Sequence, residues 1–392
     1  MKSANRLALA VVLAVGVSGG RAWAADARPA LDDAHRKQAQ ELLAGGMKFL
    51  LAAREADGGW SMGGGANKPA ITAMVLKVLI QHPDYGANHE LVKKGFETML
   101  KFRQKDGGIY DPKLGYNNYT TSLAVMALAA AKDPQKQGVL DDAVKYLRGQ
   151  QILPGSESPD GDKIAKDHPF AGGVSYGKHG RPDLSNVGMW ADAMHEAGVK
   201  PDDPAMQNAL AFVARCQNRS ESNPLPFAAE GSNDGGFIYA PALRGKPNAA
   251  QSMGGAGIGG KGLRSYGSMT YVGFKSMLYA GVAKDDPRVT AAYAWIRRYW
   301  RLDSNPNMPQ TQSKQGLFYY YHVFAKALRA WGQPVIKDME GVEHNWRHEL
   351  IDALAKQVTP NGSWNNQADR WEEGSPVLVT CYVMLALQET LK

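Results

Sequence analysis

The sequence predicts an all-α fold of the (α/α)6 toroid type, in which six outer helices surround six inner helices in a single domain. Three observations predict it. A short glycine turn recurs along the chain, two kinds of helical segment alternate around that turn, and no segment shows the alternation of apolar and polar residues that marks a strand. A chain of 392 residues would ordinarily form two or more domains, but repeats of one unit allow a single larger domain.

The recurring turn is clearest as Asp-Gly-Gly. It occurs in "EADGGW", which ends at Trp60, and in "QKDGGIY", which ends at Tyr110; Asp57 and Asp106 lie 49 residues apart. Further copies, some of them degenerate, occupy residues 171–176, 233–239, 314–320 and 360–364. Because glycine adopts positive φ without steric cost, each turn ends one helix and lets the chain reverse.

Two kinds of helix flank these turns. The segments before them are amphipathic, as in residues 141–151 and 289–300. The segments after them are apolar on nearly every side: residues 70–80, 120–131, 183–194, 268–281, 317–332 and 376–388. A helix that is apolar all round must be surrounded by protein, so these segments form the inner ring. Closure of the ring brings residues 39–51 against residues 350–357.

The first 24 residues have the features of a secretory signal peptide. A basic start precedes the apolar run 7–17, which is too short to span a bilayer, and small residues precede a cleavage site after Ala24. We therefore expect an exported protein, secreted or periplasmic, with residues 25–37 as a linker and 38–392 as the toroid. No later segment predicts a transmembrane helix.

Charge and cysteine content narrow the function classes. The formal net charge of +7 falls to +4 when Lys2, Arg6 and Arg21 leave with the signal peptide, and the remaining basic residues are dispersed. This pattern excludes a typical nucleic-acid-binding surface. The two cysteines, Cys216 and Cys381, are predicted to be buried thiols and not a disulfide framework. No motif indicates a protein partner.

The repeat resembles the QW repeat of squalene–hopene cyclases and of protein prenyltransferase β subunits. Phe-Leu is followed after three residues by Gln or Arg, and then by Asp or Asn, Gly, any residue and Trp, over roughly residues 38–391. The resemblance implies the same toroid and a central cavity. In such a cavity the positive N-termini of the inner helices converge, which suits a ligand with a polar or anionic group.

Squalene cyclases begin their reaction with an Asp-x-Asp-Asp motif at the start of an inner helix, and "PDLSN" occupies the matching place here. Asp183 matches the first aspartate, but Ser185 and Asn186 replace the other two, and neither is a strong acid. Squalene cyclisation is therefore not expected. Asp183 either caps the helix or forms a polar cluster with Arg181 and Asn186 that faces the cavity.

Metal-binding motifs of the related families are missing from the sequence. The prenyltransferases bind zinc through an Asp-x-Cys pair and a distant histidine, but Val379 stands two residues before Cys381. His344 and His348 have the spacing of a zincin helix, with Asn345 in place of the required glutamate. We interpret them as two surface histidines and expect no metal and no cofactor. The thioester signature of complement-like toroids is also missing.

Candidate site residues stand where inner helices begin. The candidate acid–base residues are titratable: His179, Asp183, His322 and Asp369. The candidate ligand-binding residues are polar or aromatic: Tyr176, Arg181, Asn186, Tyr271, Tyr320 and Trp371. Aromatic faces stabilise cations and stack on sugars, although they also fill cores. We expect these residues around one mouth of the cavity. The glycine-rich loop 254–262 is expected there either as a lid or as an insertion without a role.

Three function hypotheses follow. The first is an exported terpenoid-cyclase-like or prenyltransferase-like protein whose cavity binds a small molecule, such as an isoprenoid. The second is a non-catalytic binding or assembly scaffold. The third is a carbohydrate-active lyase or hydrolase on the same toroid, with a saccharide ligand. A greasy cavity with aromatic walls favours the first, a cavity filled by side chains the second, and a carboxylate pair across the cavity the third.

Overall fold

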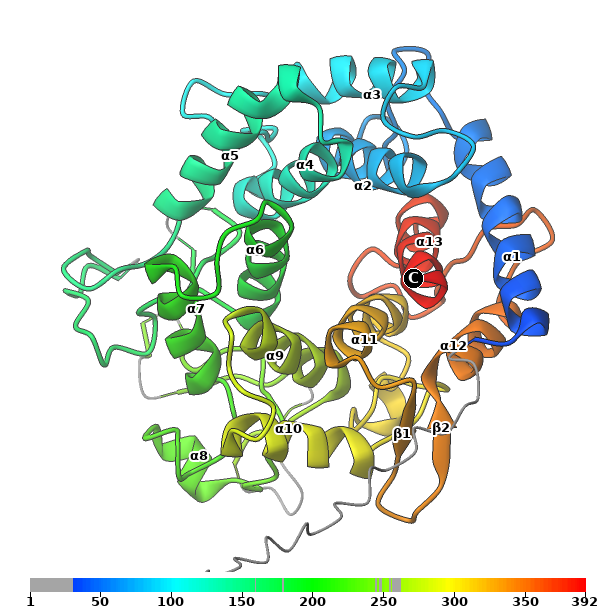
Figure 1. Cartoon of the computed structure of the whole chain (residues 1–392). Helices are drawn as coiled ribbons and strands as arrows, with labels where there is room; N and C mark the ends of the chain where they lie inside the picture. The colour runs from blue at the N-terminus through cyan, green and yellow to red at the C-terminus, as the bar shows by residue number, and fades with distance from the viewer. Residues whose placement is uncertain are drawn as a thin grey trace, which may run out of the picture.

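Two concentric rings of helices form the molecule, as Figure 1 shows. The computed structural model describes residues 31–392 except 159, 178–179, 244, 247–248, 254 and 256–261. The inner ring consists of α2 (Lys68–Gln81), α4 (Asn117–Ala131), α6 (Leu184–Glu196), α9 (Gly267–Tyr279), α11 (Leu317–Trp331) and α13 (Pro376–Leu391). The outer ring consists of α1 (Asp33–Ala52), α3 (Glu90–Leu100), α5 (Gln137–Gly149), α7 (Pro204–Arg215), α10 (Pro287–Arg298) and α12 (Trp346–Ala355). The predicted (α/α)6 toroid is confirmed.

The ring closes where the sequence predicts. Each inner helix packs against the next, and α13 packs against α2. The first outer helix, α1, contacts both the last outer helix, α12, and the last inner helix, α13, which closes the ring. Helix α1 begins at Asp33, ahead of the toroid boundary expected at residue 38, because the Asp32 side chain accepts a hydrogen bond from the His35 amide and caps it.

The repeated glycine is required by two constraints at once. Gly107, Gly172, Gly235 and Gly362 all have φ between 80° and 90°. In each case a Cβ atom would lie within 2.8 Å of a backbone carbonyl oxygen in the next outer helix along the ring. Neighbouring outer helices therefore dock directly on these turns, which explains why the turn recurs with the period of the helix pairs.

In four of the turns, the residue that follows is fixed to the next inner helix by a threonine hydroxyl. The backbone N–H of Trp60 donates to Oγ1 of Thr72 at 3.0 Å, and that of Trp364 donates to Oγ1 of Thr380 at 3.2 Å. The indole N–H of Trp60 donates to the carbonyl of Leu50 at 2.6 Å, at the end of α1. The turns that end at Trp60 and Trp364 thus tie the end of an outer helix to the inner helix that follows it.

Several short elements lie outside the two rings. They are α8 (Pro226–Glu230), the 3-10 helices η1 (Pro134–Lys136) and η3 (Gln310–Gln312), and an antiparallel hairpin of β1 (Val335–Lys337) and β2 (Glu343–Asn345). The sequence did not predict the hairpin, because strands of three residues are too short to show alternation. No helix in the described part of the chain is long and apolar enough to cross a membrane. The expected signal peptide, and all but residues 255 and 262 of loop 254–262, lie outside the described residues.

Candidate functional site

A cavity of about 280 Å³ lies at the end of the ring where the inner helices begin. All six inner helices contribute side chains near their N-termini, and the segment before α13 forms part of the wall. Seven tyrosines line it: Tyr116, Tyr119, Tyr176, Tyr239, Tyr266, Tyr319 and Tyr382. Apolar side chains fill much of the remaining wall, among them Met62, Ile71, Met74, Leu123, Met269 and Leu378. The cavity wall is therefore apolar and aromatic, and side chains do not fill the cavity.

The tyrosine hydroxyls are largely engaged with one another or with the wall. Tyr119 and Tyr382 share a hydrogen bond, and Tyr176 bonds to Ser185. Tyr239 bonds to the carboxylate of Asp183. The rings of Tyr119 and Tyr176 stack at 5.9 Å between centroids, and those of Tyr319 and Tyr382 meet edge to face at 5.8 Å. Ring faces and edges are consequently left as the main surface for a ligand.

Asp183 is the N-cap of α6 and stands behind the cavity wall. Its side chain is 1% exposed. Oδ1 accepts from the Ser185 hydroxyl at 2.6 Å and the Asn186 amide at 3.0 Å, and Oδ2 accepts from the Asn186 side chain at 2.9 Å. Burial raises the pKa of Asp183, although these hydrogen bonds oppose the shift. Of the two interpretations of Asp183, the cap fits the geometry, and Ser185 reaches the cavity in its place.

The other predicted residues at this end divide between the cavity and its surroundings. Tyr176 and Trp371 line the cavity. Arg181 lies with Asp183 in a neighbouring depression that shares Tyr176 and Tyr239, and its guanidinium sits 5.3 Å from the Tyr239 ring centroid. Asp369 is exposed and accepts a hydrogen bond from the Gly374 amide at 2.7 Å, which closes the turn before α13. His179 lies outside the described residues.

Tyr271, Tyr320 and His322 do not share this opening, so the expected single cluster is corrected. Tyr271 and Tyr320 pack against each other at 5.5 Å, and the Tyr320 hydroxyl donates to the Arg301 carbonyl, outside the inner ring. His322 lies deeper in the ring, beside a space of about 10 Å³ that shares Met74 with the cavity. Burial lowers the pKa of His322 well below its usual value, so the ring is neutral.

Glu373 is a buried acidic residue of the cavity wall that was not among the site residues predicted from the sequence. It is 1% exposed, and Oε1 accepts from the Tyr319 amide at 2.8 Å while Oε2 accepts from the Asn366 side chain at 2.6 Å. Helix α11 has no side-chain cap of its own, and Glu373 supplies the missing acceptor from another segment. Burial raises the pKa of Glu373 to about 7. The polar and aromatic cluster 368–373 did point to this segment in the sequence. It could not distinguish Glu373, which is buried, from its neighbour Glu372, which is exposed.

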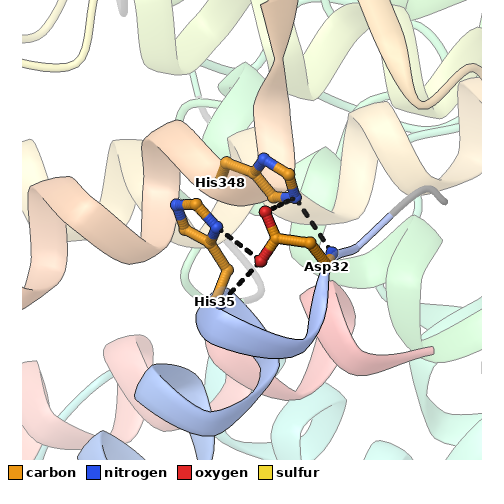
Figure 2. A group of neighbouring side chains, drawn as sticks. All are labelled: Asp32, His35 and His348. Atoms are coloured by element: carbon orange, nitrogen blue, oxygen red, sulfur yellow. Dashed lines mark hydrogen bonds and ion pairs between the residues drawn. The ribbon is translucent and has the colours of Figure 1, made fainter. Parts of the chain in front are cut away.

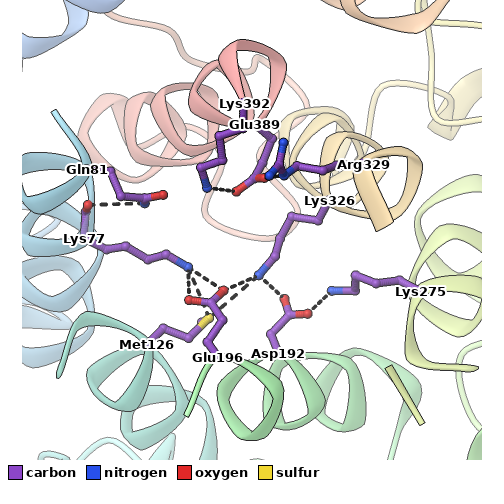
Figure 3. Close-up of polar contacts among 10 residues, drawn as sticks. All are labelled: Lys77, Gln81, Met126, Asp192, Glu196, Lys275, Lys326, Arg329, Glu389 and Lys392. Atoms are coloured by element: carbon purple, nitrogen blue, oxygen red, sulfur yellow. Dashed lines mark hydrogen bonds and ion pairs between the residues drawn. The ribbon is translucent and has the colours of Figure 1, made fainter. Parts of the chain in front are cut away.

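The opposite end of the ring holds a buried network of charges, shown in Figure 3. Lys77 of α2 pairs with Glu196 of α6 at 2.5 Å, and Lys326 of α11 lies 3.0 Å from Glu196 and 2.8 Å from Asp192. Lys275 of α9 also pairs with Asp192. Since α2 and α11 are not neighbours of α6 in the ring, these pairs cross its interior.

The charged groups of this network shift one another's pKa. Burial by itself would raise the pKa of Asp192, but Lys275 and Lys326 hold it well below its usual range. Burial lowers the pKa of Lys275 to about 8 in spite of Asp192. A sequence signal existed, because charged residues interrupt helices that are otherwise apolar all round. The interior of the ring thus has an apolar end that is open to a ligand and an opposite end that is filled by charged side chains.

Comparison with known proteins shows the fold alone. No family model matches the chain, and no curated protein matches it. Among solved structures, the type II terpene cyclase MstE from Scytonema is 15% identical with a TM-score of 0.55, and the match covers 92% of this chain and 99% of that one. A glycosidase is 13% identical, with a TM-score of 0.52 over 92% and 99% of the two chains. An α-amylase from Clostridium perfringens is 12% identical, with a TM-score of 0.52 over 91% and 97%. The chain thus has a terpenoid-cyclase-like toroid fold that terpene cyclases and glycosidases share.

Proposed function

We propose that the tyrosine-walled cavity binds an elongated, mostly apolar small molecule of the isoprenoid kind, and that the protein does not cyclise squalene. The composition of the wall carries the proposal: apolar side chains and aromatic rings dominate it, while four tyrosine hydroxyls are already bonded to the protein. A saccharide would need those hydroxyls as partners for its own. An apolar ligand needs only area to bury.

The two ends of the cavity differ in a way that orients such a ligand. Arg370 lines the cavity and is exposed, with its guanidinium 5.4 Å from the ring centroid of Trp371. Met74 and Leu123 line both the cavity and the small space beside His322. A polar or anionic head group therefore lies at Arg370, and the apolar chain points toward Met74 and Leu123.

Calorimetric titration with geranylgeraniol and, separately, with a maltohexaose tests the proposal. Ala70 of α2 lines the cavity, whereas Ala66 is exposed in the turn before α2 and does not line it, so Ala70→Phe fills the cavity and Ala66→Phe serves as the control. We expect the isoprenoid alcohol to bind the native protein and Ala66→Phe equally, and to bind Ala70→Phe at least tenfold more weakly. Failure of the isoprenoid to bind, or equal binding to both variants, would overturn the proposal.

A carbohydrate-active enzyme is the second candidate, and Glu373 favours it. A carboxyl group with a pKa of about 7 at the wall of a cavity has the acidity of a general acid at neutral pH. Glu372 also lines the cavity and would be the second carboxylate. Release of nitrophenol from chromogenic glycosides, reduced at least 100-fold in Glu373→Gln, would establish this function in place of the first.

Export is the remaining part of the proposal. The basic, apolar and small-residue segments within residues 1–24 support it. Expression of the full chain in a Gram-negative host should give a periplasmic product whose N-terminus follows Ala24. A cytoplasmic product that retains Met1 would refute export.

A further inference from the structure

A cluster of two histidines and an aspartate lies where the first and last outer helices meet, as Figure 2 shows. Asp32 is the N-cap of α1, His35 lies in its first turn, and His348 lies in the first turn of α12. One ligand atom from each residue lies within 4.8 Å of the other two, and all three side chains are half-buried. The cluster is separate from the cavity and from the charge network.

The three side chains face one another through atoms that bind metals. The Asp32 carboxylate lies between the rings, with Oδ1 at 2.8 Å from Nδ1 of His35 and Oδ2 at 3.6 Å from Nε2 of His348. The two imidazoles stack at 3.9 Å with an angle of 1° between planes.

A second carboxylate completes the arrangement from behind. Oδ2 of Asp352, in α12, lies 3.7 Å from Nε2 of His35, the ring nitrogen that does not face Asp32. Histidine ligands in metal sites usually donate this other N–H to a carboxylate or carbonyl, which orients the ring and increases its basicity. His35 therefore has both the inward partner and the outward support of a metal ligand.

We propose that Asp32, His35 and His348 bind a divalent transition-metal ion, with Zn²⁺ as the expected occupant. Two imidazole nitrogens and a carboxylate oxygen are a donor set that zinc accepts, with a water as fourth ligand. At bond lengths of about 2.0–2.1 Å the donors of a tetrahedral site lie about 3.4 Å apart. The stacked rings therefore tilt and close on the ion, and the bound metal clamps α1 to α12 where the ring closes.

The site was missed because sequence spacing pairs the wrong histidines. His344 stands four residues before His348, but it turns away, with Nε2 at 3.1 Å from Asp338 and Nδ1 at 2.7 Å from Glu349. His348 faces His35 instead, more than 300 residues away in the chain. The fold, and not the local spacing, thus selects the ligand pair.

Metal titration of the mature chain, made without a polyhistidine tag and stripped with EDTA, tests the proposal. We expect ZnCl₂ to bind at one ion per chain, to raise Tm by several degrees, and Co²⁺ to give visible d–d bands. His35→Gln and His348→Gln should each weaken Zn²⁺ binding at least 100-fold and remove the rise in Tm. The control His344→Gln should keep both.

The contrary outcomes are equally definite. No Zn²⁺ binding by the native chain, or unchanged binding by both His35→Gln and His348→Gln, would overturn the site. Loss of binding in His344→Gln would do the same. Mg²⁺ should give no response, since it prefers oxygen ligands, and a response equal to that of Zn²⁺ would also contradict the proposal. If one variant fails to fold, the other, on a different helix, decides the question.

Discussion

At the scale of single residues, the burial of Glu373 makes the stability of the protein depend on pH. Its carboxyl group is enclosed by the N-terminus of α11 and by Asn366, and burial raises its pKa to about 7 from an ordinary value of 4.5. The native state therefore holds this proton at pH values where the unfolded chain has released it. Stability from this group is full below pH 4.5 and is lost as the pH rises toward 7.

Glu373→Gln should consequently flatten the pH dependence of unfolding. As the pH rises from about 4 to about 8, we expect the free energy of unfolding of the native chain to fall relative to that of the variant by about 3 kcal/mol. Urea unfolding of both proteins across this range measures the difference. Parallel curves would show that Glu373 does not titrate in this window.

Asp183 is the N-cap of α6, and the two other acidic residues of the cyclase motif are missing beside it. We expect no cyclic triterpene after incubation with squalene, because Ser185 and Asn186 replace the acids that a squalene cyclase uses. Asp183→Ala should cost about 2–4 kcal/mol of stability, since the cap is lost and the Asn186 side chain loses its acceptor. Product analysis by mass spectrometry and urea unfolding check the two parts. A cyclic product, or an unchanged stability, would restore Asp183 as a candidate acid.

At the scale of elements, the glycine turns are the joints between outer helices. Gly172 has a φ of 83°, and a Cβ atom there would lie 1.9 Å from the carbonyl oxygen of Asn208 in α7. Gly198 has a φ of 80° but meets nothing within 4 Å. The two glycines have nearly the same positive φ, but only Gly172 packs closely against another helix.

Gly172→Ala should therefore destabilise the protein far more than Gly198→Ala. The control substitution should cost about 1 kcal/mol through strain at positive φ, whereas Gly172→Ala should cost at least about 3 kcal/mol because α7 must move. Chemical denaturation of both variants gives the comparison. Equal losses would mean that the turn, and not the docked helix, determines the requirement for glycine.

The same elements show what the sequence could predict. The recurring turns and the two kinds of helix were sufficient to predict the ring and its closure. Both the spacing of the turns and the apolar pattern of each helix can be read from short stretches of sequence. The orientation of inner-helix residues was not predictable. A helix that is apolar on every side has no polar face to mark its direction, so Tyr319, which lines the cavity, and Tyr320, which faces away, look alike in sequence. Glu373 and the pairing of His35 with His348 depend on contacts between distant segments.

At the scale of the whole molecule, the ring is joined across its interior by charge. Asp192 is shared by Lys275 and Lys326, which come from two different inner helices. Lys275 is 1% exposed, and Asp192 is the acidic partner that contacts it. Breaking a buried pair by removal of one member is costly, because the remaining charge stays out of water without compensation.

Asp192→Asn should thus lower the free energy of unfolding by about 3–5 kcal/mol near neutral pH. Lys275→Met in the same chain should recover much of this loss, because the stranded cation is replaced by an apolar side chain of similar length. The exposed pair Glu90–Lys93 is the control, and Glu90→Gln should change stability little, since solvent screens it. Guanidinium unfolding of the four proteins makes the comparison. If Asp192→Asn were as mild as Glu90→Gln, the ring would not depend on these charges, and helix packing alone would hold that end together.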